Sequence, residues 1–196
     1  MKDFDQMTTR RDILGGAGLL ALTVATGVPM MTQAAALTTD PAPEWSFESI
    51  YGGTYDSKSF AGKAILLVNT ASLCGYTPQY TALQKLQDTY KDQGLVVLAV
   101  PSDDFHQEKD SNGAVKAFCE LNYGITMPMS VISKVTGTSA HPLYQWIWAK
   151  AKFAPEWNFN KVLFDRSGRV VGTWRSGPEP MGGEIEAAIQ TVLSNA

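Results

Sequence analysis

The stretch "AILLVNTASLCGYTPQYTALQKLQDTYKDQGLVVLAV", Ala64 to Val100, decides the fold of this chain. It begins and ends with aliphatic runs, Ala64 to Ser72 and Leu95 to Val100, which are typical of strands covered on both faces. Between them the large apolar residues repeat at helical spacing, at Tyr80, Leu83, Leu86 and Tyr90. Because a strand, helix and strand in succession require a right-handed crossover, the two strands are predicted to be parallel neighbours.

The predicted helix has signals at both ends. Thr77 is expected as its N-cap, Pro78 as its first residue, and Gly94 as its C-cap. Pro101 ends the second strand. A turn that contains Cys74 therefore connects the first strand to the helix.

The rest of the chain predicts further elements. We expect a helix at about 113–121, a strand at Met127–Val135 with Pro128 at its edge, a helix at 141–151, two strands within 160–174 joined by a turn at 166–168, and a helix at 182–195. Together these elements predict an α/β, thioredoxin-like fold in which helices flank a central mixed sheet. A chain of 196 residues with 44% hydrophobic content has material for one such domain.

The N-terminus carries an export pattern. "TTRRDIL" (Thr8 to Leu14) holds paired arginines, an apolar stretch follows to Val28, and "QAAAL" offers a cleavage site. We assign residues 1–36 to a signal peptide of twin-arginine type and residues 37–196 to the domain, which is then expected in the periplasm. The alternatives are an ordinary Sec signal or a retained anchor, although the apolar stretch is short for a membrane span.

Charge and cysteine content limit the classes of partner and ligand that the protein is expected to bind. The net charge of −3 persists without the leader, so we expect no binding to nucleic acid and no stable membrane association. The two cysteines, Cys74 and Cys119, are far in sequence from the two histidines, His106 and His141. We therefore expect neither a metal nor a cofactor, whereas a periplasmic location would allow the thiols to pair.

Cys74 follows a parallel strand and precedes a helix, where open α/β sheets place their ligands. The N–H groups of the helix favour negative charge, so a thiol there can become a nucleophile; a half-buried, inert cysteine is the alternative. Thr77 stands where a Cys-x-x-Cys motif has its second sulfur, so no local disulfide can cycle. A lone thiol on this scaffold suits attack on peroxide, which gives a sulfenic acid.

Four motifs, in order, extend this interpretation: "VNTASLCGYTPQY" (68–80), "FCELNYGITMP" (118–128), "HPLY" (141–144) and "WNFNKVLFDRSGRVV" (157–171). From about Trp45 to the C-terminus the chain resembles the glutathione peroxidase family in its cysteine-containing form. The resemblance implies that Cys74 is the peroxidatic residue and reduces hydrogen peroxide and organic or lipid hydroperoxides.

The family surrounds this thiol with the Trp and Asn of a Trp-Asn-Phe motif, here Trp157 and Asn158. Both can donate N–H groups to a thiolate and to the oxygen that leaves the peroxide. For Trp157 the alternative is a core aromatic residue.

Asp104 departs from the family pattern. The usual Phe-Pro-Cys-Asn-Gln-Phe reads Val-Pro-Ser-Asp-Asp-Phe at 100–105, so Asp104 stands where a Gln donates to the sulfur, and the loop after it is one residue shorter than usual. An ionised carboxylate donates no proton, and its charge disfavours a thiolate. Three alternatives remain for Asp104. It is protonated and keeps the donor role, it acts as the base that takes the thiol proton, or it turns away from the sulfur.

Cys119 stands where two-cysteine members of the family carry their resolving thiol. The resemblance implies a Cys74–Cys119 disulfide, and the short connection before Trp157 resembles monomeric members that use a thioredoxin-like reductant; glutathione is the other possible reductant. Resolution is expected to need local opening of the helix around Cys119, and a buried cysteine that never reacts is the alternative.

Two other functions are compatible with the sequence. One is a periplasmic thiol redox sensor or disulfide-relay protein with weak peroxidase turnover. The other is a binding module in which Cys74 and Cys119 form a structural disulfide.

Overall fold

The computed structural model describes residues 36–195, so the predicted signal peptide, except Ala36, lies outside the described residues. The elements, in chain order, are β1 (Ser46–Glu48), β2 (Thr54–Asp56), β3 (Ala64–Thr70), α1 (Gln79–Tyr90), the 3₁₀ turn η1 (Lys91–Gln93), β4 (Leu95–Pro101), α2 (Asn112–Tyr123), α3 (Pro142–Ala151), β5 (Lys161–Phe164), β6 (Val170–Trp174) and α4 (Glu184–Ser194). Within residues 36–195 no helix is long and apolar enough to cross a membrane.

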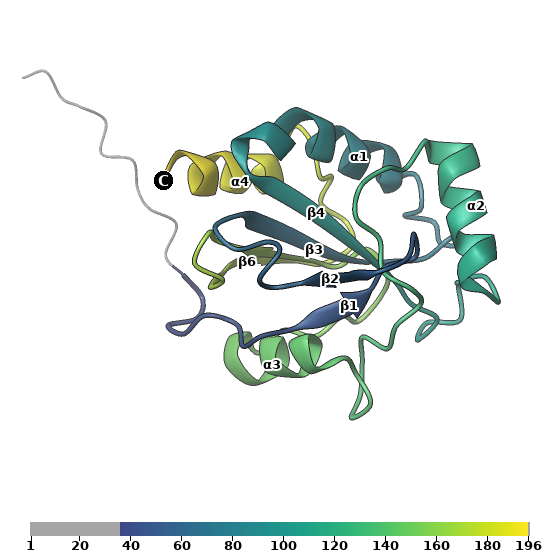
Figure 1. The fold of residues 1–196 in the computed structure, drawn as a ribbon, viewed down its shortest axis with the longest axis horizontal. Coiled ribbons are helices and arrows are strands. Elements are labelled where there is room, and N and C mark those ends of the chain that lie inside the picture. Colours follow the sequence, from purple (N-terminus) through teal and green to yellow (C-terminus); the bar gives the residue numbers. More distant parts are fainter. Residues whose placement is uncertain (1–35, 196) are drawn as a thin grey trace, which may run out of the picture. The chain divides into compact units, whose positions relative to one another are not determined.

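The central sheet has the strand order β4-β3-β5-β6 (Figure 1). β3 pairs with β4 in parallel, with Val68 opposite Ala99, which confirms the predicted crossover. β5 runs antiparallel to both β3 and β6. The sheet is therefore mixed, as expected, and β1 and β2 form a separate hairpin that the sequence did not predict.

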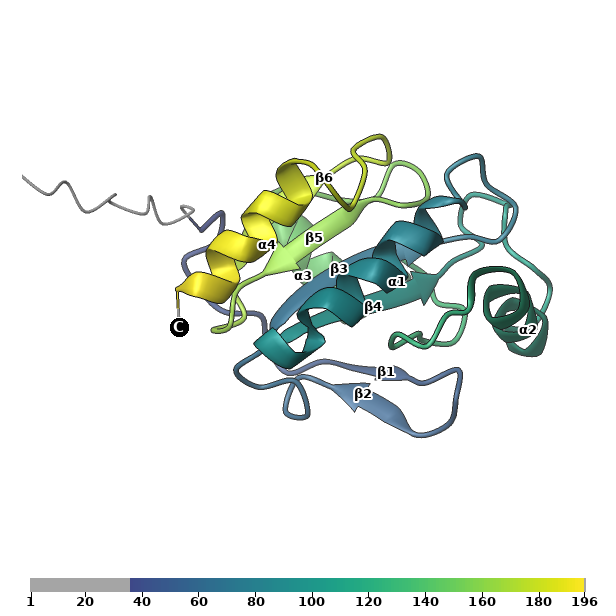
Figure 2. The same ribbon diagram turned by 90° about the horizontal axis from the view of Figure 1, so that it is seen from above.

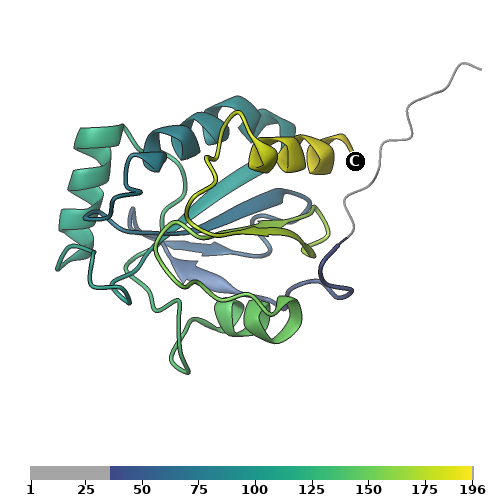
Figure 3. The same cartoon turned by 180° about the vertical axis from the view of Figure 1, so that it is seen from behind.

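Both faces of the sheet are covered, because every residue of β3 is buried and alternate side chains point to opposite sides. Leu66 and Val68 belong to a core that includes α1 and α4, whereas Leu67 belongs to a second core that includes α3. Figures 1 and 3 show α1 and α4 on one side of the sheet and α3 on the other. Figure 2 shows α2 beyond the end of the sheet to which β4 points.

The predicted strand at Met127–Val135 was wrong. Only isolated bridges form there, between Met129 and Ala99 and between Ser130 and Ser49. Pro128 has no N–H to donate, and Val131 donates its N–H to Glu48 O at 2.9 Å. The segment therefore connects β4 to the β1–β2 hairpin instead of extending the sheet.

The ends of α1 also differ from the prediction. The helix begins at Gln79 with Pro78 as its N-cap, and Thr77 does not cap it. The Thr77 Oγ1 atom instead accepts from Cys74 N and donates to Ala71 O, at 3.0 and 2.9 Å. Gly94, with φ of 95°, caps η1 rather than α1 itself.

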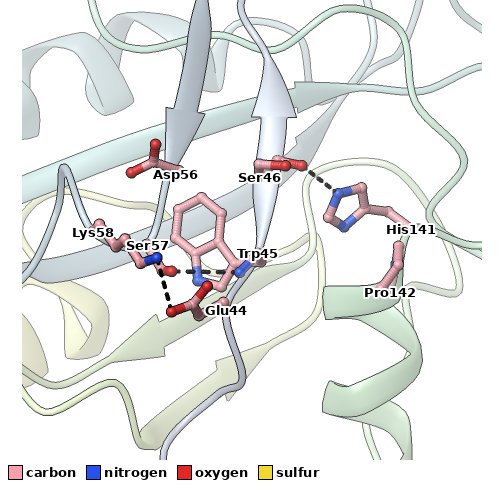
Figure 4. Close-up of a pocket in the computed structure, with 8 residues that line it drawn as sticks. All are labelled: Glu44, Trp45, Ser46, Asp56, Ser57, Lys58, His141 and Pro142. Carbon is pink, nitrogen blue, oxygen red and sulfur yellow. Dashed lines mark hydrogen bonds and ion pairs between the residues drawn. The ribbon is translucent and has the colours of Figure 1, made fainter.

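His141 caps α3 and joins it to β1. Its Nδ1 atom accepts from Leu143 N at 3.2 Å, so the proton is on Nε2, which donates to Ser46 O at 2.8 Å (Figure 4). The ring stacks on Phe47 with centroids 3.8 Å apart. His141 and Lys58 border a hollow of about 350 Å³. Both ring nitrogens of His141 already form hydrogen bonds within the protein.

We predict that His141 makes stability fall in mild acid. Burial lowers its pKa, so below about pH 6.5 the unfolded chain takes up a proton that the folded protein rejects. In His141→Asn, which keeps a capping side chain, the loss of unfolding free energy between pH 7.5 and 5 should be smaller. Urea unfolding at the two pH values measures this difference.

His106→Asn is the matched control, because His106 is exposed and Asn tolerates its φ of 56°. Equal pH dependence in His141→Asn and the unmodified protein would contradict the prediction.

Candidate active site

Cys74 lies in a tight turn just beyond the end of β3. Thr77 N donates to Cys74 O at 3.0 Å, which closes the turn before α1. The backbone N–H of Tyr76 points at the sulfur, with 3.4 Å between N and Sγ. The residue is 8% exposed, so the thiol lies near the surface but is shielded from bulk water.

Asn69, in β3, holds the Trp157–Asn160 segment against this turn. Its side-chain Nδ2 donates to Trp157 O at 3.0 Å, and its Oδ1 accepts from Asn160 N at 3.0 Å. Its main-chain O accepts from Phe159 N at 2.6 Å. Its main-chain N–H also donates to Asn160 O at 3.3 Å. Four hydrogen bonds of one buried residue therefore hold the Trp-Asn-Phe motif beside the strand that leads to Cys74.

Phe159 adopts a left-handed conformation with φ of 61°, which is rare for a bulky residue. Its side chain is fully buried, and its ring meets Tyr80 of α1 edge-on, with centroids 5.4 Å apart. Such strain persists only where the surroundings over-determine it, and it gathers at functional sites. Asn69 and the aromatic core supply that constraint here.

Trp157 and Asn158 differ in environment. Trp157 is 41% exposed, and its ring lies 5.5 Å from that of Phe105, so it is not a core residue. Asn158 is fully buried and donates through Nδ2 to Gln107 Oε1 at 3.0 Å. Its Oδ1 has no hydrogen-bond partner among the described residues.

The carboxylate of Asp104 is held by the 134–136 segment. Its Oδ2 atom accepts from the backbone N–H groups of Val135 and Thr136 at 2.7 and 2.9 Å, and its Oδ1 pairs with Lys134 Nζ at 2.9 Å. Burial opposes its ionisation, but these donors outweigh it and hold the pKa of Asp104 below its ordinary value. An ionised, fully engaged carboxylate is neither a donor nor a strong base, so the geometry favours the third alternative.

Sequence reasoning missed Gln107 and Glu108. Gln107 O accepts from Leu73 N at 2.9 Å, and Glu108 Oε1 accepts from Ser72 N at 3.0 Å. Both residues thus fasten the loop after β4 to the two residues that precede Cys74. They lie in a polar loop without periodicity, so nothing in the sequence singled them out.

Cys119 lies on α2 and is completely buried. Burial raises its pKa to about 11, and the Tyr80 hydroxyl beside it offsets only part of this shift. Cys74 and Cys119 are both free thiols and belong to the same core cluster. The two sulfurs therefore share one side of the sheet but differ in access to solvent.

The site holds acceptors and donors but no metal cluster. Among residues 36–195, no three His, Cys, Asp or Glu side chains are placed to bind a metal ion. The group that the structure places against the Cys74 sulfur is the backbone N–H of Tyr76. A thioredoxin-like fold with one thiol at the end of its first central strand defines a thiol-dependent oxidoreductase.

Comparison with known proteins identifies the class more closely. The family model "Glutathione peroxidase" matches residues 44–148. A glutathione peroxidase of Lactococcus lactis is 43% identical, over 76% of this chain and 98% of that protein. The hydroperoxy fatty acid reductase gpx1 of Synechocystis is 38% identical, over 76% of this chain and 94% of its own. The crystal structure of T. cruzi GPX1 superposes with a TM-score of 0.59 at 29% identity, covering 76% of this chain and 94% of that one.

The chain belongs to the glutathione peroxidase family, and it is an oxidoreductase that reduces peroxides. The thioredoxin-like fold expected from the sequence is confirmed.

We predict that Asp104→Ala lowers the free energy of unfolding but leaves the rate of reaction with hydrogen peroxide nearly unchanged. Because two backbone N–H groups and Lys134 lose their acceptor, the free energy of unfolding at pH 7 should fall by about 2 kcal/mol. The rate of reaction with hydrogen peroxide should stay within about threefold, since both carboxylate oxygens are bound by the 134–136 segment. Urea unfolding and stopped-flow Trp fluorescence measure the two effects.

Asp110→Ala, at an exposed position in the same loop, is the control and should change neither quantity. A hundredfold loss of rate in Asp104→Ala would instead assign the base role to the carboxylate.

Proposed function

We propose that Cys74 is the peroxidatic residue of a two-cysteine cycle. Its thiolate attacks one peroxide oxygen, the O–O bond breaks, and the other oxygen leaves and takes up a proton. The peroxide is reduced to an alcohol or water, and the sulfur is oxidised to a sulfenic acid. N–H groups of Trp157 and Asn158 stabilise the charge on the leaving oxygen.

One observation carries this proposal: the side chain of Asn69 fastens the Trp157–Asn160 segment to the strand that ends at the thiol turn. Donors are most effective when they are in place before charge develops, because no reorganisation is then needed. The Tyr76 N–H that points at Sγ adds a backbone donor from the turn itself.

Cys119 is the proposed resolving thiol. As a thiolate it attacks the sulfenic sulfur of Cys74, an S–S bond forms, and the oxygen leaves as water. Because Cys119 is buried and its pKa is about 11, this step requires α2 to open. A thioredoxin-like dithiol, or two molecules of glutathione, then reduces the disulfide.

Lipid hydroperoxides are the proposed bulky substrates. Three exposed apolar side chains support this. Leu73 and Tyr76, on either side of Cys74 in sequence, are 59 and 39% exposed, and Trp157, in the segment that Asn69 binds, is 41% exposed. Such a rim can contact an acyl chain while its hydroperoxide group reaches the sulfur. The hydroperoxy fatty acid reductase of Synechocystis, by its name, acts on a substrate of this kind.

The location and assembly belong to the same proposal. The arginine pair at Arg10 and Arg11 and the apolar stretch after it support export by the twin-arginine pathway and activity in the periplasm. There the enzyme acts as a monomer and receives electrons from a thioredoxin-like donor or from exported glutathione. Fractionation of cells that produce the full chain, with and without Arg10→Lys and Arg11→Lys, tests the location.

The decisive experiment mixes reduced protein with one equivalent of hydrogen peroxide or a fatty acid hydroperoxide in a stopped-flow instrument. We expect a Trp fluorescence change at least about a hundredfold faster than oxidation of free cysteine, followed by loss of both thiols. Cys74→Ser should abolish the reaction, and Cys119→Ser should retain the fast phase but lose one thiol. A fast single turnover with slow steady-state reduction would favour the sensor function.

The second step should depend on pH in a way that reveals helix opening. If Cys119 reacts after α2 opens, it ionises with the ordinary cysteine pKa of about 8.5, so disulfide formation should accelerate from pH 7 and level off above pH 9. Oxidation should also increase tryptic cleavage after Lys116 of α2 but not after Lys85 of α1. A rate that rises tenfold per unit up to pH 11 would instead mean reaction from the closed helix.

A further inference from the structure

We infer that a pocket beside α3 binds the acyl tail of a fatty acid hydroperoxide while its hydroperoxide group reacts at Cys74. The inference rests on the proposed function and adds the position of the tail. This α3 pocket has a volume of about 520 Å³, which is typical of ligand pockets. The lining residues that carry the argument are Val135, Thr136, Ala140, Tyr144, Trp148 and Ala154.

The lining of the α3 pocket suits a hydrocarbon chain. None of its nine residues is charged, and the indole of Trp148 is 56% exposed. The Thr136 hydroxyl already donates to Asp104 Oδ2 at 3.2 Å. The Gln145 amide donates to Ala140 O at 2.7 Å. An acyl chain gains free energy by leaving water, whereas a charged ligand would lose its hydration without finding a counter-charge.

The α3 pocket begins at the edge of the sheet that carries the thiol. Because β3 and β4 are parallel, the turn that holds Cys74 and the end of β4 at Pro101 lie at the same edge. Ser133 donates its N–H to Pro101 O at 2.8 Å. This hydrogen bond brings the segment that leads into the pocket wall at Val135 to the edge where the thiol turn lies.

Aromatic rings connect the proposed substrate rim to the α3 pocket. The Phe105 ring lies 5.5 Å from that of Trp157, one of the exposed rim residues. Phe105 also packs against the core cluster that includes Val135 and Tyr144. On the other wall, Ala154 lies only three residues before Trp157. An apolar path therefore leads from Trp157 over Phe105 to the α3 pocket.

Asp104 fixes the α3 pocket to the loop that carries Phe105. Its Oδ2 atom accepts from Val135 N and Thr136 N at 2.7 and 2.9 Å. Both of these residues line the pocket, and Phe105 follows Asp104 in the sequence. The path and the pocket are thus held together before a substrate arrives, which lowers the entropic cost of binding its tail.

The test measures the rate constants of the reduced protein with hydrogen peroxide, tert-butyl hydroperoxide and monomeric linoleic acid hydroperoxide, by loss of peroxide. Trp148→Ala removes an exposed wall of the pocket, so the rate with linoleic acid hydroperoxide should fall about tenfold. The rates with the two small peroxides should stay within about twofold, since neither has a tail that reaches the pocket. Trp148→Phe keeps an aromatic wall and should recover the rate to within about threefold.

Leu121→Ala is the matched control, because Leu121 is an apolar residue of α2 that is 85% exposed and does not line the α3 pocket. It should leave all three rates unchanged. Equal losses for all three peroxides in Trp148→Ala would mean that the substitution acts on the thiol. A loss confined to reduction of the oxidised protein by a dithiol would assign the pocket to the reductant. Either result would overturn the inference.

Tyr144→Phe tests the chemical class of the ligand. The Tyr144 hydroxyl has no hydrogen-bond partner among the described residues, so its removal breaks no contact within the protein. An acyl tail should bind equally well, and the rate with linoleic acid hydroperoxide should not change. A loss as large as that in Trp148→Ala would mean that the pocket binds a polar group, which would overturn the assignment to a tail.

Binding without turnover separates the inference from the proposed function. In the Cys74→Ser protein, cis-parinaric acid should bind with an increase in its own fluorescence, and adding Trp148→Ala should raise its Kd about tenfold. If the unmodified protein reacts with peroxides no faster than free cysteine, the proposed function fails, and this measurement still decides whether the pocket takes an acyl chain. If the unmodified protein reacts fast but Trp148→Ala changes neither the linoleic acid hydroperoxide rate nor this Kd, only the inference fails.

Discussion

The buried carboxamide of Asn69 is the interaction on which the candidate site depends. A polar side chain inside a fully buried strand is costly unless it is paired, and here both ends of the amide are used by backbone groups of the 157–160 segment. The strand that carries Asn69 also ends at the thiol turn, so one element positions both the proposed nucleophile, Cys74, and the loop with its proposed donors. The strained backbone of Phe159 is stable because the same residue accepts its N–H.

The charged side chains Asp104 and Lys161 are each held by specific partners. The ionised carboxylate of Asp104 pairs with Lys134 and accepts from two backbone N–H groups of the 134–136 segment. Lys161, which is fully buried, donates to Gln79 Oε1 and to the backbone O of Ser176 and Pro178, and burial lowers its pKa to about 8. It ties the first residue of α1 to the loop after β6.

The sequence was sufficient for the elements but not for the contacts between loops. Local signals, the apolar runs of β3 and β4 and the helical spacing after Pro78, predicted the parallel core correctly. The strand at Met127–Val135 failed because its hydrogen-bond partners lie in β1 and β4, which no local pattern reveals. The orientation of Asp104 likewise depends on Lys134, thirty residues away. Asn69 could have been found, since it interrupts an aliphatic run, whereas Gln107 carried no such signal.

The segments that carry the two thiols differ in how firmly they are held, and this difference suits the proposed two-step cycle. The Cys74 turn is held by hydrogen bonds that its backbone N–H groups donate to Thr77, Gln107 and Glu108, so the first step of the proposed cycle would take place in a rigid site. α2, in contrast, buries only Val115 and Cys119, and helices with few buried apolar contacts open at a small fraction of the cost of global unfolding. The proposed cycle needs only this helix to open, because the hydrogen bonds of Asn69 and of the Cys74 turn are made outside α2. In the proposed cycle, the raised pKa of Cys119 in the closed helix keeps this thiol unreactive until α2 opens.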